Sequence, residues 1–400
     1  MVDSPGIQQT ASLTRVPRMH LVLAFGAFIL IGGNDGALGV LIPSIQTSYR
    51  IDAVTISWLF LFFSAGFLIA SFNNGLLMTK LGVRRFLLLG VMLFILGTGL
   101  FSLKPPFALF LVTGTLLGFG VGMMDAGLNA YIASLPRNAT LLNYLHAFYG
   151  IGALLGPLVA STLLALQTGW QATYIVWSAL ALLLFCGLWF TFKQPSQLLK
   201  AEAEASTDRR IFAILRLRGV CLAAFFLVFY TGTEVSLGKW GYSFLTMARS
   251  GPLLFSAWIV SGYWCGLTLG RLTLANLAPR LGIRRLITLC LAGVMPGLLL
   301  AWLLPGFWGA APGLCLVGFS LGPLYPTMIA LTSQFVSARQ LPGAIGFLSC
   351  LGSGGASFFP WLASAFIQKL GFWFLLPFTL LLAVGMLGVW LVLMKQPASA

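Results

Sequence analysis

Charged residues are scarce in this chain. Only 8% of its 400 residues are Asp, Glu, Lys or Arg, whereas 59% are hydrophobic and the mean hydropathy is +0.96. A soluble domain keeps roughly a quarter of its residues charged so that its surface stays hydrated. The scarcity excludes an ordinary soluble protein and predicts an all-α polytopic protein solvated by lipid.

Acidic residues are especially few, with 8 Asp and Glu against 23 Lys and Arg, so the formal net charge is +15. In a soluble protein this excess would suggest nucleic acid as a partner. Here the basic residues fall mainly in short segments between apolar runs, where they indicate membrane topology. No nucleic-acid partner is therefore expected.

Residues that carry enzyme chemistry are also sparse. The chain has 2 His and 6 Cys, with no CxxC pair, zinc-ligand spacing, phosphate-binding loop or hydrolytic triad. We therefore expect neither an enzyme nor a bound metal or cofactor. Without an ATP site, the energy for transport would come from an ion gradient or from the solute gradient itself.

Long apolar runs dominate what is present. A helix needs about 20 apolar residues to cross the hydrocarbon core, and the sequence predicts about twelve such transmembrane helices. The runs fall at 17–46, 53–79, 83–104, 107–136, 141–168, 170–192, 216–246, 250–277, 283–304, 307–336, 341–368 and 371–394.

A polar stretch at 193–215 interrupts these runs. It predicts a cytoplasmic linker between an N-terminal six-helix bundle, 17–192, and a C-terminal six-helix bundle, 216–394. Short cytoplasmic tails would occupy 1–16 and 395–400. Most Lys and Arg residues fall on the side that holds these tails, which predicts that both termini are cytoplasmic in the cell (inner or plasma) membrane. The chain is expected to work as a monomer.

The two halves share an internal repeat. KLGVRR at 80–85 matches RLGIRR at 280–285, and GFGVG at 118–122 matches GFSLG at 318–322. The first helix of each half also matches: Gly33, Asp35, Leu38 and Gly39 correspond to Gly232, Glu234, Leu237 and Gly238. A parallel duplication explains this register, and it predicts a solute site between two pseudo-symmetric bundles near mid-membrane.

Three carboxylates, Asp35, Asp125 and Glu234, lie inside apolar runs. A charge at the bilayer centre costs at least about 2.5–3.5 kcal/mol, so such a residue should face the bundle interior and have a function. Desolvation disfavours the ionised form, which suits proton coupling. The alternative is a fixed interhelical hydrogen bond or ion pair. Lys239, five residues after Glu234, could neutralise that carboxylate.

Glycines surround Asp35 in the sequence GGNDGALG. They could permit a broken helix at a transport site, or only close helix packing. The sequence leaves both alternatives open.

Polar side chains in the fourth and fifth runs could contact a solute. An antiparallel hairpin would bring Asn129, Asn143 and His146 together, with Tyr131 opposite His146. Amides donate and accept hydrogen bonds, which suits sugar hydroxyls, although they could instead only join helices. His20 is expected at the membrane interface. The aromatic residues that could line the site, or else pack the bundle, are Tyr149, Trp240, Tyr263, Trp264 and Tyr325.

These features resemble the major facilitator superfamily, whose fold has two six-helix bundles and a basic loop between helices 2 and 3 of each half. GLLMTKLGVRR at 75–85 is similar to its loop signature, with Thr79 where Asp is usual and Lys80 where Arg is. The resemblance implies that the basic residues of the two loops gate the cytoplasmic side. These are Lys80, Arg84, Arg85, Arg280, Arg284 and Arg285.

Finer motifs resemble the fucose–proton symporter family, which includes glucose and galactose members. The matching residues are Asn34-Asp35 before Leu41-Ile42-Pro43; Asp125 before Asn129-Ala130-Tyr131; Leu142-Asn143, His146, Phe148, Gly152 and Pro157; and Tyr230, Gly232, Glu234, Gly238 and Trp240. Ala130 departs from the usual Pro. The resemblance spans the chain and implies proton-coupled sugar transport with Asn34 at the solute site.

Two functions remain open. The first is proton-coupled symport of a monosaccharide or similar small polar solute by alternating access. The second is proton-coupled antiport that exports amphipathic compounds, because GALLGPLVA at 152–160 resembles a motif of drug antiporters. A site lined by Asn, His and carboxylates would favour symport, and one lined by Phe and Met would favour antiport.

Overall fold

The structure, a computed structural model, describes residues 18–135, 138–192, 217–274, 277–337 and 340–395. Every regular element in these ranges is helical. The predicted tail at 1–16, the linker at 193–215 and the last five residues lie outside the described part.

The N-terminal half consists of the helices α1 to α5. Their bounds are α1 Arg18–Tyr49, α2 Ala53–Ser102, α3 Phe107–Ala133, α4 Asn138–Ala165 and α5 Gln171–Thr191. α2 is interrupted by non-helical backbone at Gly82, so it contains two of the predicted spans.

The C-terminal half repeats this arrangement. Its elements are α8 Arg218–Ser243, the π-helix η1 Phe244–Ala248, α9 Leu253–Thr273, α10 Ala278–Leu281, α11 Ile283–Leu303, α12 Gly306–Leu321, α13 Leu324–Thr332, α14 Leu341–Leu370, the 3-10 helix η3 Phe372–Phe374 and α15 Leu375–Met394. Together α12 and α13 form one span.

In the described part, 11 helices are long and apolar enough to cross a membrane, and α2 accounts for two crossings. The prediction of twelve spans in two six-helix halves is therefore confirmed.

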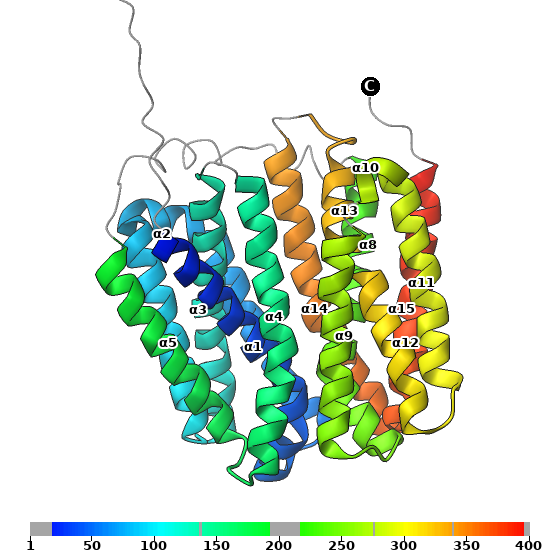
Figure 1. Cartoon of the computed structure of the whole chain (residues 1–400), viewed down its shortest axis with the longest axis horizontal. Coiled ribbons are helices and arrows are strands. Elements are labelled where there is room, and N and C mark those ends of the chain that lie inside the picture. Colours follow the sequence, from blue (N-terminus) through cyan, green and yellow to red (C-terminus); the bar gives the residue numbers. More distant parts are fainter. Residues whose placement is uncertain (1–17, 136–137, 193–216, 275–276, 338–339, 396–400) are drawn as a thin grey trace, which may run out of the picture.

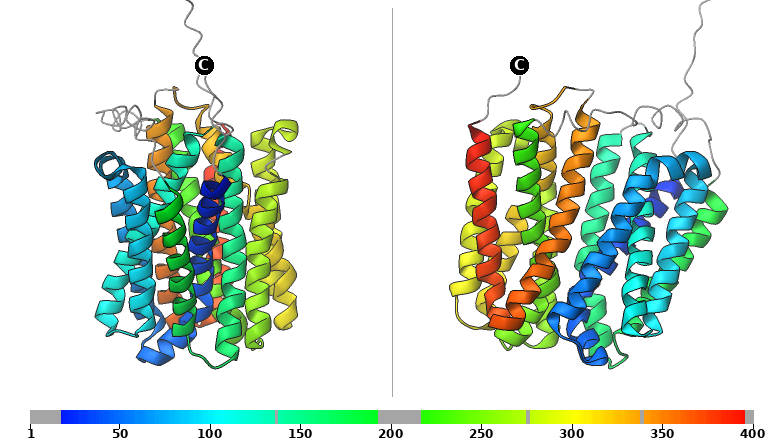
Figure 2. Two further views of the ribbon diagram at one scale, coloured as in Figure 1. Left: turned by 60° about the vertical axis from the view of Figure 1, so that its left-hand side comes forward. Right: turned by 180° about the vertical axis from the view of Figure 1, so that it is seen from behind.

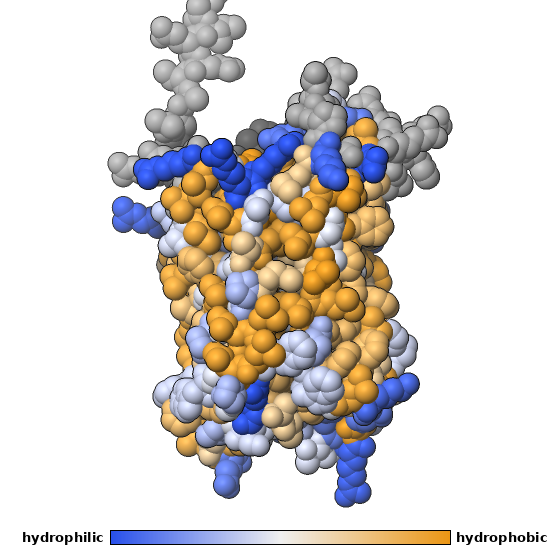
Figure 3. All heavy atoms as spheres, turned by 90° about the vertical axis from the view of Figure 1, so that its right-hand side faces the viewer, coloured by the Kyte–Doolittle hydropathy of each residue, from blue (hydrophilic) through white to orange (hydrophobic). Residues whose placement is uncertain are grey.

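The helices run side by side, with α1 to α5 in one half of the molecule and α8 to α15 in the other (Figures 1 and 2). α1 begins and α15 ends at the same end of the bundle, which we call the terminal side; the other end is the far side. In Figure 3 hydrophobic residues cover the middle of the visible face, and hydrophilic residues gather at its two ends. This distribution fits a lipid belt between two aqueous faces.

The duplication is visible in the backbone. Gly82 and Gly282 have φ values of 72° and 82°, in the left-handed region that favours glycine. Two residues further on, Arg84 donates to the Trp189 carbonyl at 2.7 Å and Arg284 to the Met394 carbonyl at 3.3 Å. Each arginine thus holds the loop against the last helix of its own half. Lys80, Arg85, Arg280 and Arg285 are exposed.

Glycines at repeat-related positions let helices approach closely. A Cβ on Gly118 would lie 1.9 Å from the Phe63 carbonyl oxygen, and a Cβ on Gly318 would lie 2.1 Å from that of Tyr263. The GFGVG and GFSLG motifs therefore pack α3 on α2 and α12 on α9, in keeping with small residues at membrane helix interfaces.

The glycines around Asp35 serve packing. α1 is continuous, and a Cβ on Gly32 or Gly36 would lie 2.0 Å or 2.3 Å from carbonyl oxygens of α4. Gly152 and Gly156 of α4 face α1 in the same way. Of the two alternatives, the broken helix is wrong and close packing is right.

Replacing Gly118 with Ala should destabilise the fold, because the added methyl group has no room beside the Phe63 backbone. We expect a loss of about 1–3 kcal/mol, read as a lower melting temperature in detergent, and a similar loss for Gly318→Ala. Gly75→Ala is the matched control, since nothing lies within 4 Å of its Cβ position. Equal melting temperatures for Gly118→Ala and Gly75→Ala would contradict the packing account.

Candidate functional site

An ion pair joins the two halves near mid-bundle. Lys239 on α8 forms a salt bridge with Asp35 Oδ1 on α1, and its Nζ also donates to the Asp35 backbone oxygen at 2.9 Å. Tyr149 on α4 donates its hydroxyl to Asp35 Oδ2 at 2.7 Å. The Asp35 side chain is 30% exposed and that of Lys239 is 8% exposed. The carboxylate is therefore both paired and reachable by water.

The helices that carry this pair touch through their backbones. A Cβ on Gly39 would lie 2.4 Å from the Gly238 carbonyl oxygen. Gly238 directly precedes Lys239, so the α1–α8 crossing places the ammonium against Asp35. The matching glycines at 39 and 238 thus position the charged pair as well as marking the repeat.

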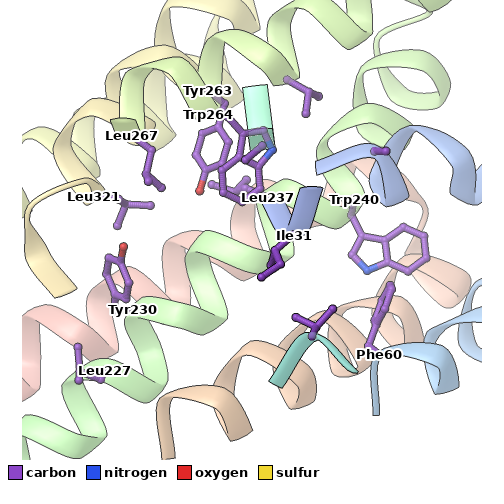
Figure 4. Close-up of a cluster of buried hydrophobic side chains, with 14 of the residues drawn as sticks. Ile31, Phe60, Leu227, Tyr230, Leu237, Trp240, Tyr263, Trp264, Leu267 and Leu321 are labelled. Carbon is purple, nitrogen blue, oxygen red and sulfur yellow. The ribbon is translucent and has the colours of Figure 1, made fainter. Parts of the chain in front are cut away.

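A second ion pair lies within the C-terminal half. Arg271 Nη2 on α9 approaches Glu234 Oε1 at 3.2 Å and Tyr230 Oη at 3.4 Å, while its Nε donates to the Gly322 carbonyl at 3.2 Å. The Tyr263 hydroxyl donates to the Glu234 backbone oxygen at 3.0 Å. In Figure 4 the hydroxyls of Tyr230 and Tyr263 face the space between their helices.

The sequence-based pairing of Glu234 with Lys239 is wrong. Glu234 pairs with Arg271, and Lys239 turns to the other half because five residues do not place two side chains on one helix face. Arg271, to which the sequence analysis assigns no site role, lies in the bundle. The sequence feature that could have identified Arg271 as a site residue is that it is the single charged residue in the run 250–277.

Asp125 has a different environment. Its carboxylate accepts a hydrogen bond from Asn129 Nδ2 at 3.2 Å, and within the described residues no cation pairs with it. Tyr325 lies within electrostatic range of both Asp125 and Glu234, and its hydroxyl donates to Ser349 at 3.2 Å. Asp125 therefore faces the C-terminal half without a counter-charge.

His146 and Asn143 lie on the exposed part of α4. The His146 ring meets Phe28 edge-on, with centroids 5.6 Å apart, and lies within electrostatic range of Arg271. These neighbours come from α1 and α9, which places His146 between the halves. Tyr149, which donates to Asp35, is also within electrostatic range of Glu234 and Arg271. Asp35, Glu234 and His146 are therefore linked electrostatically through Tyr149 and Arg271.

Other expected site residues are enclosed by protein. Trp240 is fully buried, donates its indole N–H to the Pro360 carbonyl at 2.9 Å and packs on Phe60. Its solute contact is not available in this conformation. Asn34 and Trp264 are also buried, and the Asn34 Oδ1 and Trp264 Nε1 atoms make no hydrogen bond to the described residues.

Tyr131 does not face His146. Its hydroxyl lies 2.8 Å from His20 Nδ1, and its ring packs edge-on against Phe192. His20 is 8% exposed and stacks on Phe192, so it is a buried partner of Tyr131 at the start of α1. The predicted hairpin gives the position of Tyr131 along the helix axis but not the direction of its side chain around that axis. In the structure, the Tyr131 side chain on α3 points toward the start of α1.

The halves are in contact on the far side. Gln368 donates to Asp52 Oδ2 at 2.8 Å, and Trp58 and Trp361 pack with centroids 6.0 Å apart. Deeper in the bundle, Ser357 hydrogen-bonds Ser64 across the halves. The Thr55 hydroxyl and backbone N–H hold the pKa of Asp52 below its usual value, so this carboxylate stays ionised at neutral and mildly acidic pH.

Another contact between the halves lies nearer mid-bundle. Ser261 donates to the Leu154 carbonyl at 2.9 Å. On the part of α4 toward the terminal side, the site residues Asn143 and His146 are exposed. A cavity of about 650 Å³ lies on the far side between the end of α1 and the end of α14, lined in part by Gln46, Arg50 and Gln368.

Comparison with known proteins gives consistent matches. Residues 23–255 and 240–400 match the family profile described as Major Facilitator Superfamily. The chain is 23% identical to Bypass of stop codon protein 6 of Saccharomyces cerevisiae, over 88% of this chain and 78% of that protein. It is 21% identical to the glucose/mannose transporter GlcP of Bacillus subtilis, over 81% and 85%.

Solved structures share the fold. A D-xylose–proton symporter superposes with a TM-score of 0.79 at 15% identity, covering 95% of this chain and 98% of that one. The Escherichia coli fucose–proton symporter FucP superposes with a TM-score of 0.65 at 17% identity, covering 94% and 99%. The predicted resemblance and the predicted fold are confirmed.

Removing one member of the Glu234–Arg271 pair should destabilise the protein more than removing both members. Arg271→Gln leaves Glu234 uncompensated, and we expect a loss near the lower end of about 3–5 kcal/mol, since the Arg271 side chain is 24% exposed. The double variant Glu234→Gln/Arg271→Gln should regain most of that loss, measured as melting temperature in detergent.

Arg85→Gln, which removes an exposed arginine, is the control for loss of charge alone. A double variant that is as unstable as the sum of the two single variants would show that the residues do not act as a pair.

Proposed function

Because this chain belongs to the Major Facilitator Superfamily, we propose that it is a proton-coupled symporter for a monosaccharide or a similar small polar solute. It is a multi-pass membrane protein, and sugar transporters are among its relatives. Alternating access would operate by rocking of the α1–α5 half against the α8–α15 half around one central site.

The observation that carries this proposal is the network of carboxylates and cations between the halves. Asp35 pairs with Lys239 across the interface, and Glu234 with Arg271 beside it. Isolated charges in a membrane protein are costly and are retained where they serve a transport path. Since Asp35 belongs to one half and Lys239 to the other, a change in its ionisation acts directly on how the halves fit together.

The surroundings suit a polar solute. Asn129, which is hydrogen-bonded to Asp125, offers donors and an acceptor, and the exposed side chains of Asn143 and His146 on α4 offer more, as hydroxyl recognition requires. Tyr149 and Tyr325 add hydroxyls and flat rings. The similar proteins include a glucose/mannose transporter and a D-xylose–proton symporter, which supports the same class of solute.

The topology completes the proposal. With the termini in the cytoplasm of a cell with an inner or plasma membrane, the terminal side faces inward. The structure would then be the inward-facing state, closed by the far-side contacts of Asp52 and Trp58 and, deeper in the bundle, by the contact of Ser64 with Ser357. Asp35, Asp125 and Glu234 are the proposed proton-coupling groups, and the chain would function as a monomer.

The antiport alternative has less support. Gly152 and Gly156 of its motif pack against α1, so their presence is explained by helix contact. The remaining argument is Asp125, whose unpaired carboxylate could attract an organic cation.

Proteoliposomes containing a pH dye should distinguish the two functions. For symport, adding a monosaccharide outside should acidify the lumen, where the dye reports the pH, as protons enter with the solute. Asp35→Asn should abolish this signal, because an amide cannot carry the proton. Lys104→Gln, which removes an exposed charge outside the site and the contacts between the halves, should leave it intact.

The opposite result is equally clear. If no member of a monosaccharide panel moves protons and a lipophilic cation dissipates an imposed pH gradient, the symport proposal fails and antiport replaces it.

A further inference from the structure

Lys239 makes two contacts with one residue of the opposite half. Its ammonium bonds both the side chain and the backbone oxygen of Asp35, and its own side chain is 8% exposed. No other cation of the described residues pairs with Asp35. The bond spans the place where α1 and α8 are in closest backbone contact, at Gly39 and Gly238.

Opening the far side must separate α1 from α8. Separation leaves Asp35 without its ammonium partner while Tyr149, which belongs to the same half, stays beside it. Removing one partner of a buried ion pair leaves an uncompensated charge at a cost of several kcal/mol. A proton on Asp35 removes that cost, whereas reclosure brings the ammonium back and disfavours the protonated carboxyl.

We propose that Lys239 is the positioning residue that expels the proton from Asp35 when the far side closes. This inference rests on the proposed function and deepens it by naming the group that ties proton release to the conformational change. The step balances: Asp35 changes from carboxylic acid to carboxylate, Lys239 stays an ammonium, and the proton passes to water on the terminal side. The Asp35 side chain is 30% exposed, so part of it is not covered by protein, and the proposed step releases the proton from there.

The other groups facing Asp35 cannot replace Lys239. Tyr149 donates a neutral hydroxyl from α4. Glu234, within electrostatic range on α8, is negative and would favour retention of the proton, and Arg271 on α9 is already bound to Glu234. Asp52 in the far-side contact stays ionised at mildly acidic pH, so it does not supply a pH response of its own.

Infrared difference spectroscopy of the purified protein tests the proton directly. Near neutral pH in detergent without solute, the wild type should show no protonated carboxyl band assignable to Asp35. Lys239→Gln should show a new carboxylic-acid C=O band, which Asp35→Asn/Lys239→Gln then lacks. A merely structural role for Lys239 would produce no such band.

Spin-label distances test the link to the gate. Labels at Thr47→Cys and Lys369→Cys, on the far side and in a chain without native cysteines, should report a short distance at pH 8 and a population shift to longer distances at pH 5. Lys239→Gln should lose this pH-dependent shift, and Lys239→Arg, which keeps the charge, should retain it. Lys104→Gln, which removes an exposed far-side lysine, should behave as wild type.

A Lys239→Gln variant with no new carboxyl band and the wild-type pH shift overturns the proposal. If that variant does not fold, Lys239→Arg decides, because loss of the pH shift in a folded protein that keeps the charge also overturns it. Neither readout uses a solute, so failure here is distinct from a failure to find sugar-driven proton movement.

Discussion

The contact on which the rest of the structure depends is the ion pair between Asp35 and Lys239. It is the point where a titratable group, the interface between the halves and the water-accessible side of the site coincide. Tyr149 fixes the second carboxylate oxygen, so the pair has a defined geometry. A protein built in this way cannot change the charge of Asp35 without changing the energy of the α1–α8 contact.

The duplicated scaffold makes that pair possible. Repeat-related glycines, such as Gly118 and Gly318, bring helices within backbone contact inside each half. Arg84 and Arg284 tie each loop to the last helix of its half. In the proposed cycle each half would move as a packed unit, and the change would be concentrated at their interface, where Asp35 meets Lys239.

Much of this could be predicted from the sequence, because hydropathy and the 200-residue repeat are local or periodic signals. The spans, the two halves and the importance of Asp35 follow from them. The interaction partners of these residues do not follow from such signals. Asp35 and Lys239 are 204 residues apart, and the spacing of residues does not reveal that α3 directs Tyr131 toward His20. Arg271 was missed because a lone arginine near a helix end has the same appearance as a topology signal.

Locking a contact between the two halves tests the account most directly. Ser64 and Ser357 are hydrogen-bonded across the halves, so Ser64→Cys/Ser357→Cys in a chain without native cysteines should form a disulfide. Oxidation should stop monosaccharide transport in proteoliposomes, reduction should restore it, and Asn143→Cys should stay reactive to a maleimide from the terminal side throughout. Full transport by the cross-linked protein would contradict alternating access around the Asp35–Lys239 pair.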